Sequence, residues 1–218
     1  MFLIIILLII FYLLYIEPPK ECRDCVVNLK SNNITGGGNI KDFRLYIKNC
    51  NGFKKEVEEI CKNNKWNELI KKHNKTLTVV EKDANITIDF ADRNIIGNIF
   101  GKKDYYDSGV LTRYNKKTKE EIYFSVTVND DMRYTLIDEI NWNEGVLYSG
   151  MNLKQYRRYV ILHELGHLLG YGHVPFSPNK FNMMYQWTRG INAEQDKLRK
   201  YTFDNIEPSE DDITKPIW

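Results

Sequence analysis

The segment from His163 to His173 limits the possible folds more than any other part of this sequence. It matches the pattern H-E-x-x-H-x-x-G-x-x-H at every fixed position. Histidines four residues apart lie on one face of an α-helix, so His163 and His167 can bind one cation. Gly170 can take a positive φ and turn the chain sharply, which brings His173 back as a third ligand.

This pattern predicts a zinc site of the catalytic kind, because three protein ligands leave a fourth position for water. Glu164, between the first two histidines, would stand beside the metal as a proton acceptor. The alternative is a core helix with a few hydrogen-bonded polar side chains. That alternative must hold for three of the chain's four histidines at once, so we favour the zinc site.

The composition fits a single folded domain and argues against nucleic acid as a partner. With 218 residues, of which 43% are hydrophobic, the chain can bury one good core. Its 31 basic and 29 acidic residues nearly balance and give a formal net charge of +2. A nucleic-acid-binding protein would instead concentrate basic residues on one face.

An unbroken apolar run from Phe2 to Ile16 precedes the charged, proline-containing sequence that starts at Glu17. As a helix it is about 22 Å long, which is short of a hydrocarbon core of about 30 Å and typical of the central part of a signal peptide. It lacks a small-x-small cleavage site and a basic N-terminal stretch. We therefore prefer an uncleaved signal anchor at 1–16 over a cleaved signal peptide, and both over a buried soluble helix. Either signal predicts an external or lumenal domain, membrane-anchored or secreted.

Residues 17–40 have the composition of a linker, and residues 41–218 are predicted to form the folded domain. All four cysteines lie in the first third of the chain, at Cys22, Cys25, Cys50 and Cys61. An even number of cysteines in an exported chain favours disulfides, with three possible connectivities. The most local choice pairs Cys22 with Cys25 and Cys50 with Cys61.

Hydrophobic periodicity predicts an α+β fold, because alternating apolar residues indicate strands and helical spacing indicates helices. The predicted strands cover Asp42 to Asn49, Leu77 to Val79, Ile86 to Phe90, Ile122 to Val128 and Tyr134 to Ile140, with a hairpin arm near Gly109 to Tyr114 and a helix from about Phe53 to His73. This order implies a mixed, mostly parallel twisted sheet packed on two main helices, the second of which carries the histidines.

The histidine helix has a readable start. Asn152 and Gln155 have the spacing of a capping box, in which each side chain accepts a hydrogen bond from the backbone of the other. Apolar residues such as Val160 and Leu165 then cover more than one face of the helix. A helix that is apolar around much of its circumference is expected at the centre of a domain.

Met184, eleven residues after the end of the motif, lies in the sequence Asn182-Met183-Met184-Tyr185. Together these segments resemble the metzincin clan of zinc proteases, in which a conserved methionine turn lies beneath the metal. The stretches Tyr156–Glu164 and Met184–Thr188 look most like a family of uncharacterised, mostly secreted bacterial metzincin-like domains. The order of strands and helices resembles the matrixin catalytic domain. Specific similarity covers roughly Trp142 to Thr188.

The resemblance implies a zinc-dependent endopeptidase with one catalytic Zn²⁺, in which Glu164 is the general base and Met184 supports the metal site. Tyr185 and Trp187 then either line a substrate pocket or fill the core. An extended peptide or protein substrate would add a strand to the sheet edge, for which we expect Glu121 to Val128. Two other functions share these residues: a non-catalytic, zinc-stabilised surface recognition module, and a zinc hydrolase of a non-peptide amide.

Overall fold

The computed structural model describes residues 40–48, 52–91, 112–114, 121–123, 126–128, 133–145, 150–177, 180–185, 187 and 203–213. By their contacts these residues all belong to one unit, Ile34–Trp218, of the two into which the chain divides. The predicted signal anchor, most of the linker and the cysteines Cys22, Cys25 and Cys50 lie outside the described residues. Among the helices of the described part, none is long and apolar enough to cross a membrane.

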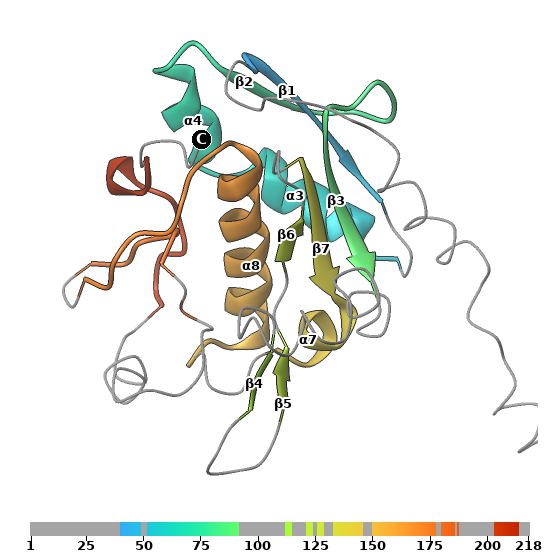
Figure 1. Cartoon of the computed structure of the whole chain (residues 1–218). Coiled ribbons are helices and arrows are strands. Elements are labelled where there is room, and N and C mark those ends of the chain that lie inside the picture. Colours follow the sequence, from blue (N-terminus) through green and yellow to red (C-terminus); the bar gives the residue numbers. More distant parts are fainter. Residues whose placement is uncertain are drawn as a thin grey trace, which may run out of the picture. The chain divides into compact units, whose positions relative to one another are not determined.

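A five-stranded mixed sheet forms one layer of this unit, with the strand order β2-β1-β3-β7-β6 (Figure 1). Its strands are β1 Asp42–Ile47, β2 Thr76–Val79, β3 Ile86–Ala91, β6 Val126–Val128 and β7 Tyr134–Asp138. The pairs β1/β2, β1/β3 and β3/β7 are parallel, and β6 pairs with β7 in the antiparallel sense. The prediction of a mixed, mostly parallel sheet is therefore confirmed.

Side-chain alternation decides which face of the sheet is buried. In β1 the apolar residues Phe43, Leu45 and Ile47 are at most 2% exposed, whereas Asp42 and Arg44 are exposed. Successive side chains of a strand point to opposite faces, so the sheet presents one apolar face. The apolar residues of β1 and β3 belong to the same buried core as those of the helices.

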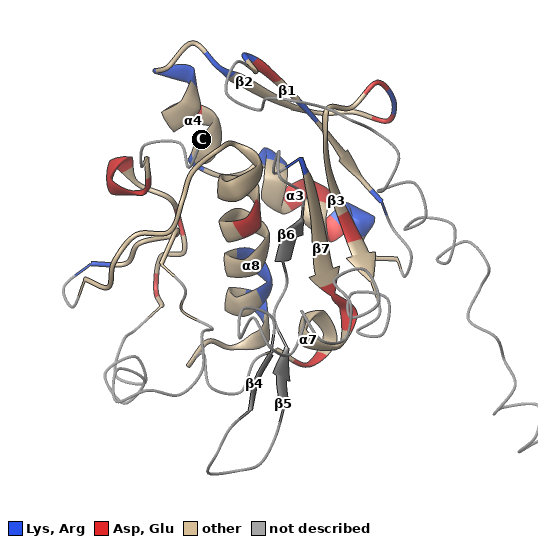
Figure 2. Cartoon of the chain, viewed as in Figure 1, with Lys and Arg blue, Asp and Glu red and all other residues tan. Residues whose placement is uncertain are grey.

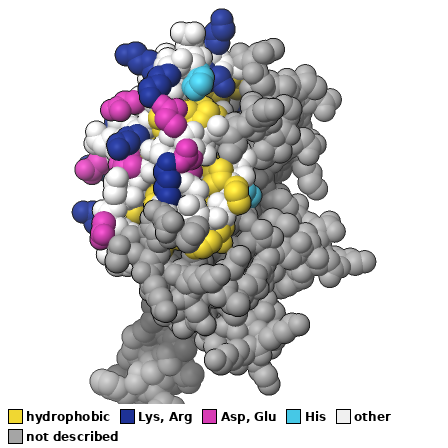
Figure 3. Space-filling model, turned by 90° about the vertical axis from the view of Figure 1, so that its left-hand side faces the viewer, with side chains coloured by type: hydrophobic (Ala, Val, Ile, Leu, Met, Phe, Trp, Pro, Cys, Tyr) yellow, Lys and Arg dark blue, Asp and Glu magenta, His cyan; other side chains and the backbone are white. Residues whose placement is uncertain are grey.

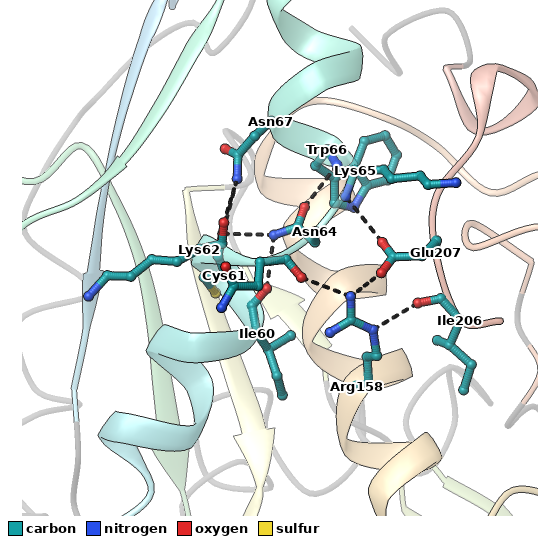
Figure 4. A network of polar contacts seen from close by, with 11 residues as sticks. Ile60, Cys61, Lys62, Asn64, Lys65, Trp66, Asn67, Arg158, Ile206 and Glu207 are labelled. Atoms are coloured by element: carbon teal, nitrogen blue, oxygen red, sulfur yellow. Dashed lines mark hydrogen bonds and ion pairs between the residues drawn. The ribbon is translucent and has the colours of Figure 1, made fainter.

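The predicted helix from Phe53 to His73 is two helices, α3 Lys54–Lys62 and α4 Trp66–Lys71, and Asn64 explains the break (Figure 4). Nδ2 of Asn64 donates to the carbonyls of Ile60 and Cys61 at 2.9 and 2.7 Å. Its Oδ1 accepts from the Trp66 N–H at 2.8 Å. The Asn64 amide thus forms hydrogen bonds with backbone groups at both the end of α3 and the start of α4. The chain can therefore change direction there at little cost in lost hydrogen bonds.

Cys61, in the last turn of α3, is a free thiol that is 1% exposed. Burial raises its pKa to about 12. It packs as an apolar residue of the core. The disulfide expected between Cys50 and Cys61 is therefore not formed.

The predicted strand from Ile122 to Val128 is also two elements. Strands β4 Thr112–Tyr114 and β5 Glu121–Tyr123 pair in the antiparallel sense as a separate two-stranded sheet. Only β6 joins the main sheet, where it lies at one edge. The alternation of apolar residues correctly indicated extended chain. It could not predict with which strands β5 and β6 would pair.

The predicted strand from Tyr134 to Ile140 ends at Asp138, because this residue caps a helix that the periodicity did not predict, α7 Glu139–Glu144. The Asp138 side chain accepts a hydrogen bond from the Asn141 N–H at 2.8 Å. Gly145, with φ 77°, follows the last residue of α7. Helix α7 thus has a side-chain cap at its start and a glycine at its end.

Helix α8, Leu153–Leu168, starts at the predicted capping box. The Gln155 N–H donates to Asn152 Oδ1, and the Asn152 N–H donates to Gln155 Oε1, both at 2.9 Å. Every residue from Tyr159 to Leu168 is buried, so α8 is central to the domain. Within that buried part, Glu164 is the only Lys, Arg, Asp or Glu side chain (Figure 2).

Residues Phe203–Ile213, named here the C-terminal segment, contain a short 3₁₀ helix, η4 Glu210–Asp212. Ion pairs join the surface of this segment to other parts of the chain, as between Lys72 and Glu210 and between Lys180 and Asp211. Figure 3 shows acidic and basic side chains interspersed on one face of the molecule. Such exposed pairs contribute little stability each, so the segment must be held mainly by its buried contacts.

Candidate metal centre

The end of α8 delivers the third histidine through a Schellman turn. Gly170 has φ 98°, the Tyr171 N–H donates to the Gly166 carbonyl, and the Gly170 N–H donates to the His167 carbonyl, each at 2.9 Å. A side chain is disfavoured at that φ, which explains the glycine. The turn brings His173 beside the two histidines of the helix.

Backbone carbonyls fix the tautomers of the two helix histidines. Nδ1 of His163 lies 2.8 Å from the Met183 carbonyl oxygen, and Nδ1 of His167 lies 2.8 Å from that of Tyr171. A carbonyl only accepts, so each Nδ1 carries the proton and each Nε2 presents a lone pair. A carbonyl behind the imidazole is a common arrangement for metal-binding histidines.

The three Nε2 atoms converge on one point. Nε2 of His173 lies 3.3 Å from that of His163 and 3.0 Å from that of His167. Three nitrogens bound to a tetrahedral ion at about 2.0–2.1 Å would be roughly 3.3–3.4 Å apart. If His173 is neutral and carries its proton on Nε2, it can donate that proton to the Nε2 lone pair of His163 or of His167, but not to both. A bound cation would instead accept the Nε2 lone pairs of all three histidines. The histidines lie close enough together to bind one metal ion.

The site is buried on the helix side and open at His173. His163 and His167 are 6% and 7% exposed, whereas His173 is exposed. Burial, together with the neighbouring histidines, lowers the pKa of His163 well below 6.5, and burial lowers the pKa of His167. Both imidazoles are therefore neutral near pH 7, which is the form that binds metals. A further ligand can approach from the side of His173.

Glu164 follows His163 on α8 and is 5% exposed. The structure thus places the predicted carboxylate in the same buried turn of helix as the first ligand. Glu164 lies three residues before His167, so the two side chains lie on one face of α8.

Met184 and Trp66 pack beneath the helix between its two ligands, and both are 0% exposed. A Cβ on Gly166 would lie 2.3 Å from Met184 Sδ and 2.9 Å from Trp66 Cζ2, so this close approach requires glycine. The Trp66 ring is fixed by its Nε1–H, which donates to the Leu162 carbonyl at 2.9 Å. No pattern in the sequence connected Trp66 with the site.

Tyr159 is a second residue that the sequence reasoning missed. Its hydroxyl lies 3.2 Å from His163 Nδ1, donates to the Tyr185 carbonyl at 2.7 Å and accepts from the Trp187 N–H at 3.1 Å. Burial raises the pKa of this hydroxyl well above 10.0, so it keeps the proton that it donates. The signal was available, because residues four apart share a helix face.

Of the two residues considered for a substrate pocket, Trp187 fills the core. It is 0% exposed, its Nε1–H donates to the Asn182 carbonyl at 2.7 Å, and its ring stacks on Phe181 with centroids 5.3 Å apart. Tyr185 is half-buried and packs against Phe176 with ring centroids 5.3 Å apart. Only Tyr185 of this pair is placed to touch a bound molecule.

Residues 110–215, a little under half of the chain, match a family model described as a protein of unknown function, DUF3152. The matched range includes the three histidines, Met183 and Met184. No curated protein matches the chain. The similarity therefore reaches the candidate metal centre without attaching an activity to it.

Proposed function

We propose that this protein is a zinc-dependent endopeptidase of the metzincin type, with His163, His167 and His173 as metal ligands and Glu164 as general base. The observation that carries the proposal is the convergence of the three Nε2 lone pairs at one point that is open at His173. Three imidazoles suit several transition metals, and tetrahedral spacing favours zinc among them. An open side distinguishes a catalytic site from a closed structural one.

Zinc, when bound, supplies a Lewis acid for the scissile carbonyl and lowers the pKa of water. Glu164 accepts a proton from the attacking water and passes it to the leaving amine, which is the role of a general base that later acts as an acid. Its buried position suits this role, because fixed groups in a water-poor site act without reorganisation.

For the substrate we propose an extended peptide that lies along β6. Among the strands that the structure describes, β6 is one edge of the five-stranded sheet, and an edge strand can pair with a further strand. The sequence predicted that residues 121–128 would form the edge that binds the substrate. Because β5 belongs to the separate small sheet, we now expect only residues 126–128 to do so.

The test is Glu164→Gln in the full-length chain, measured with an unfolded, fluorescence-quenched protein substrate and with zinc content determined on the same sample. We expect hydrolysis to fall at least about 10²-fold while bound zinc is unchanged, because the general base is lost and the ligands are kept. Glu144→Gln, at an exposed residue of α7, is the matched control and should keep full activity.

Three results would count against this function. Unchanged hydrolysis in Glu164→Gln would remove its catalytic role. Zinc binding without chelator-sensitive proteolysis in the unaltered protein would favour a recognition module or a hydrolase of non-peptide amides. Absence of zinc binding would remove the site itself.

We also propose that residues 2–16 direct the chain to a membrane and leave the metal centre on the external or lumenal side. The basis is the apolar run in the sequence. Recovery of the full-length protein in the alkali-washed membrane fraction is expected for an anchor, recovery in the medium for a cleaved signal, and recovery in the cytosol would contradict both.

A further inference from the structure

The C-terminal segment reaches the back of the metal centre through one buried carboxylate. Asp212 is 0% exposed although it lies in a short surface helix. Its Oδ1 accepts from the Met184 N–H at 2.9 Å, and its Oδ2 accepts from the Ser209 N–H at 2.8 Å and from the Ser209 hydroxyl at 3.2 Å.

These three donors require a carboxylate rather than an amide. An ionised carboxylate has about four acceptor sites and no donor, which matches the surroundings of Asp212. An asparagine would turn an N–H towards at least one of these N–H or O–H groups. Burial raises the pKa of Asp212, and the hydrogen bonds from Met184 and Ser209 oppose that rise.

The carboxylate is one peptide group away from a metal ligand. Asp212 accepts from the Met184 N–H, and the carbonyl of that same peptide group, which belongs to Met183, accepts from His163 Nδ1 at 2.8 Å. From the other side, the Tyr159 hydroxyl holds the same turn at the Tyr185 carbonyl. A shift of the Met183 peptide would therefore rotate or release the imidazole of His163.

The C-terminal segment is itself hydrogen-bonded to α8 at several points. Gln155 Nε2 donates to the Phe203 carbonyl at 2.8 Å. Arg158 Nε donates to the Ile206 carbonyl at 3.0 Å (Figure 4). Glu207 pairs with Arg158 and accepts from the Lys65 N–H at 3.1 Å. These contacts hold Asp212 at a fixed place relative to the helix that carries the ligands.

We propose that Asp212 is a positioning residue of the metal centre, whose carboxylate fixes the Met183–Met184 backbone and thereby orients His163 for the metal. This proposal rests on the proposed function in so far as the three histidines bind zinc. A purely structural role, as the cap of η4, is the alternative. The two roles differ in metal affinity, which a cap would leave unchanged in a folded protein.

The experiment compares Asp212→Asn with Asp211→Asn in the full-length chain. Asp211 loses the same charge one residue earlier, but its carboxylate is exposed and pairs with Lys180. Zinc affinity is measured by competition with a fluorescent chelator, cobalt coordination by its visible absorption, and folding of the metal-free protein by circular dichroism. We expect Asp212→Asn to weaken zinc binding about tenfold, the lower end for partners behind a ligand, and to change the cobalt spectrum. Asp211→Asn should leave both unchanged.

Equal zinc affinity in folded Asp212→Asn and in the unaltered protein would overturn the proposal, and a lowered melting temperature alone would assign Asp212 to the cap. If Asp212→Asn does not fold, Ser209→Ala takes its place, because it removes one donor and leaves the carboxylate. A measurable loss of zinc affinity in Ser209→Ala supports positioning, and no loss overturns it. Failure of the proposed function would appear separately, as absent zinc binding or absent proteolysis in the unaltered protein.

Discussion

Replacing Gly166 by alanine tests how tightly the metal centre is built. In an isolated helix this change would stabilise by about 1 kcal/mol, because glycine is the poorer helix former. In α8 the new Cβ would lie 2.3 Å from Met184 Sδ and 2.9 Å from Trp66 Cζ2. Ordinary contacts between such atoms are about 3.5–4.0 Å, so both side chains must move by about an ångström.

Neither side chain has room to move. Met184 is flexible, but at 0% exposure it is surrounded by other groups. Trp66 stacks on Tyr171 at 5.1 Å and donates to the Leu162 carbonyl. Overpacking of a tight core costs about 1–3 kcal/mol, and two simultaneous clashes favour the upper end. After the gain in helix propensity, we expect a net loss of about 2 kcal/mol.

Urea denaturation of the metal-free protein, followed by tryptophan fluorescence, measures this loss. A double-mutant cycle with Met184→Ala identifies its cause. Met184→Ala alone should cost about 2–5 kcal/mol by leaving a cavity, and the alanine at 166 should partly fill that cavity, with a favourable coupling of at least about 1 kcal/mol. A Gly166→Ala protein that is more stable than the original, or a coupling near zero, would refute the packing argument.

Two further perturbations test the neutral histidines and the helix break. Because the pKa values of His163 and His167 are lowered from 6.5, the unfolded chain binds protons below that pH which the folded, metal-free chain does not. The free energy of unfolding should therefore fall as the pH drops below 6.5, by up to about 1.4 kcal/mol per pH unit for each histidine. A free energy of unfolding that stays constant from about pH 7.5 to 5.5 would contradict this expectation. Asn64→Ala should lower the free energy of unfolding by about 2 kcal/mol, because three hydrogen bonds are lost. The control Asn63→Ala, at an exposed side chain, should change it little. Equal effects of the two variants in urea denaturation would show that the Asn64 amide does not stabilise the break between α3 and α4.

The parts of the fold that the sequence predicted well are those with local causes. The capping box needs only Asn152 and Gln155, and the turn needs only a glycine at 170. Strand positions followed from alternation along each strand. The break at Asn64 was not predictable in the same way, because an asparagine in a helical stretch becomes a cap only when its amide finds the neighbouring backbone groups.

The parts that failed depend on partners far along the chain. Apolar residues do alternate from Ile122 to Val128, but the two halves of this stretch belong to different sheets, since β5 pairs with β4 and β6 pairs with β7. For Trp187 the sequence left a substrate pocket and the core equally open, and the residue lies in the core, where it stacks on Phe181 and donates to the Asn182 carbonyl. Asp138 was the exception, since an aspartate followed by Glu139 is a readable helix start that the strand pattern obscured.

The histidine motif alone does not determine function, because the metal centre also depends on residues that lie far from the motif in the sequence. The motif places three imidazoles, but the proton on His163 Nδ1 is directed by the Met183 carbonyl, 20 residues later. The Met184 N–H of that same peptide group is held by the carboxylate of Asp212, 28 residues after Met184. A chain that kept every fixed position of the motif and lost Asp212 would match the same pattern. Glu164→Gln should remove hydrolysis and keep zinc, whereas Asp212→Asn should weaken zinc binding itself. Measured side by side, the two variants separate the chemistry of the motif from the support that the rest of the fold gives it.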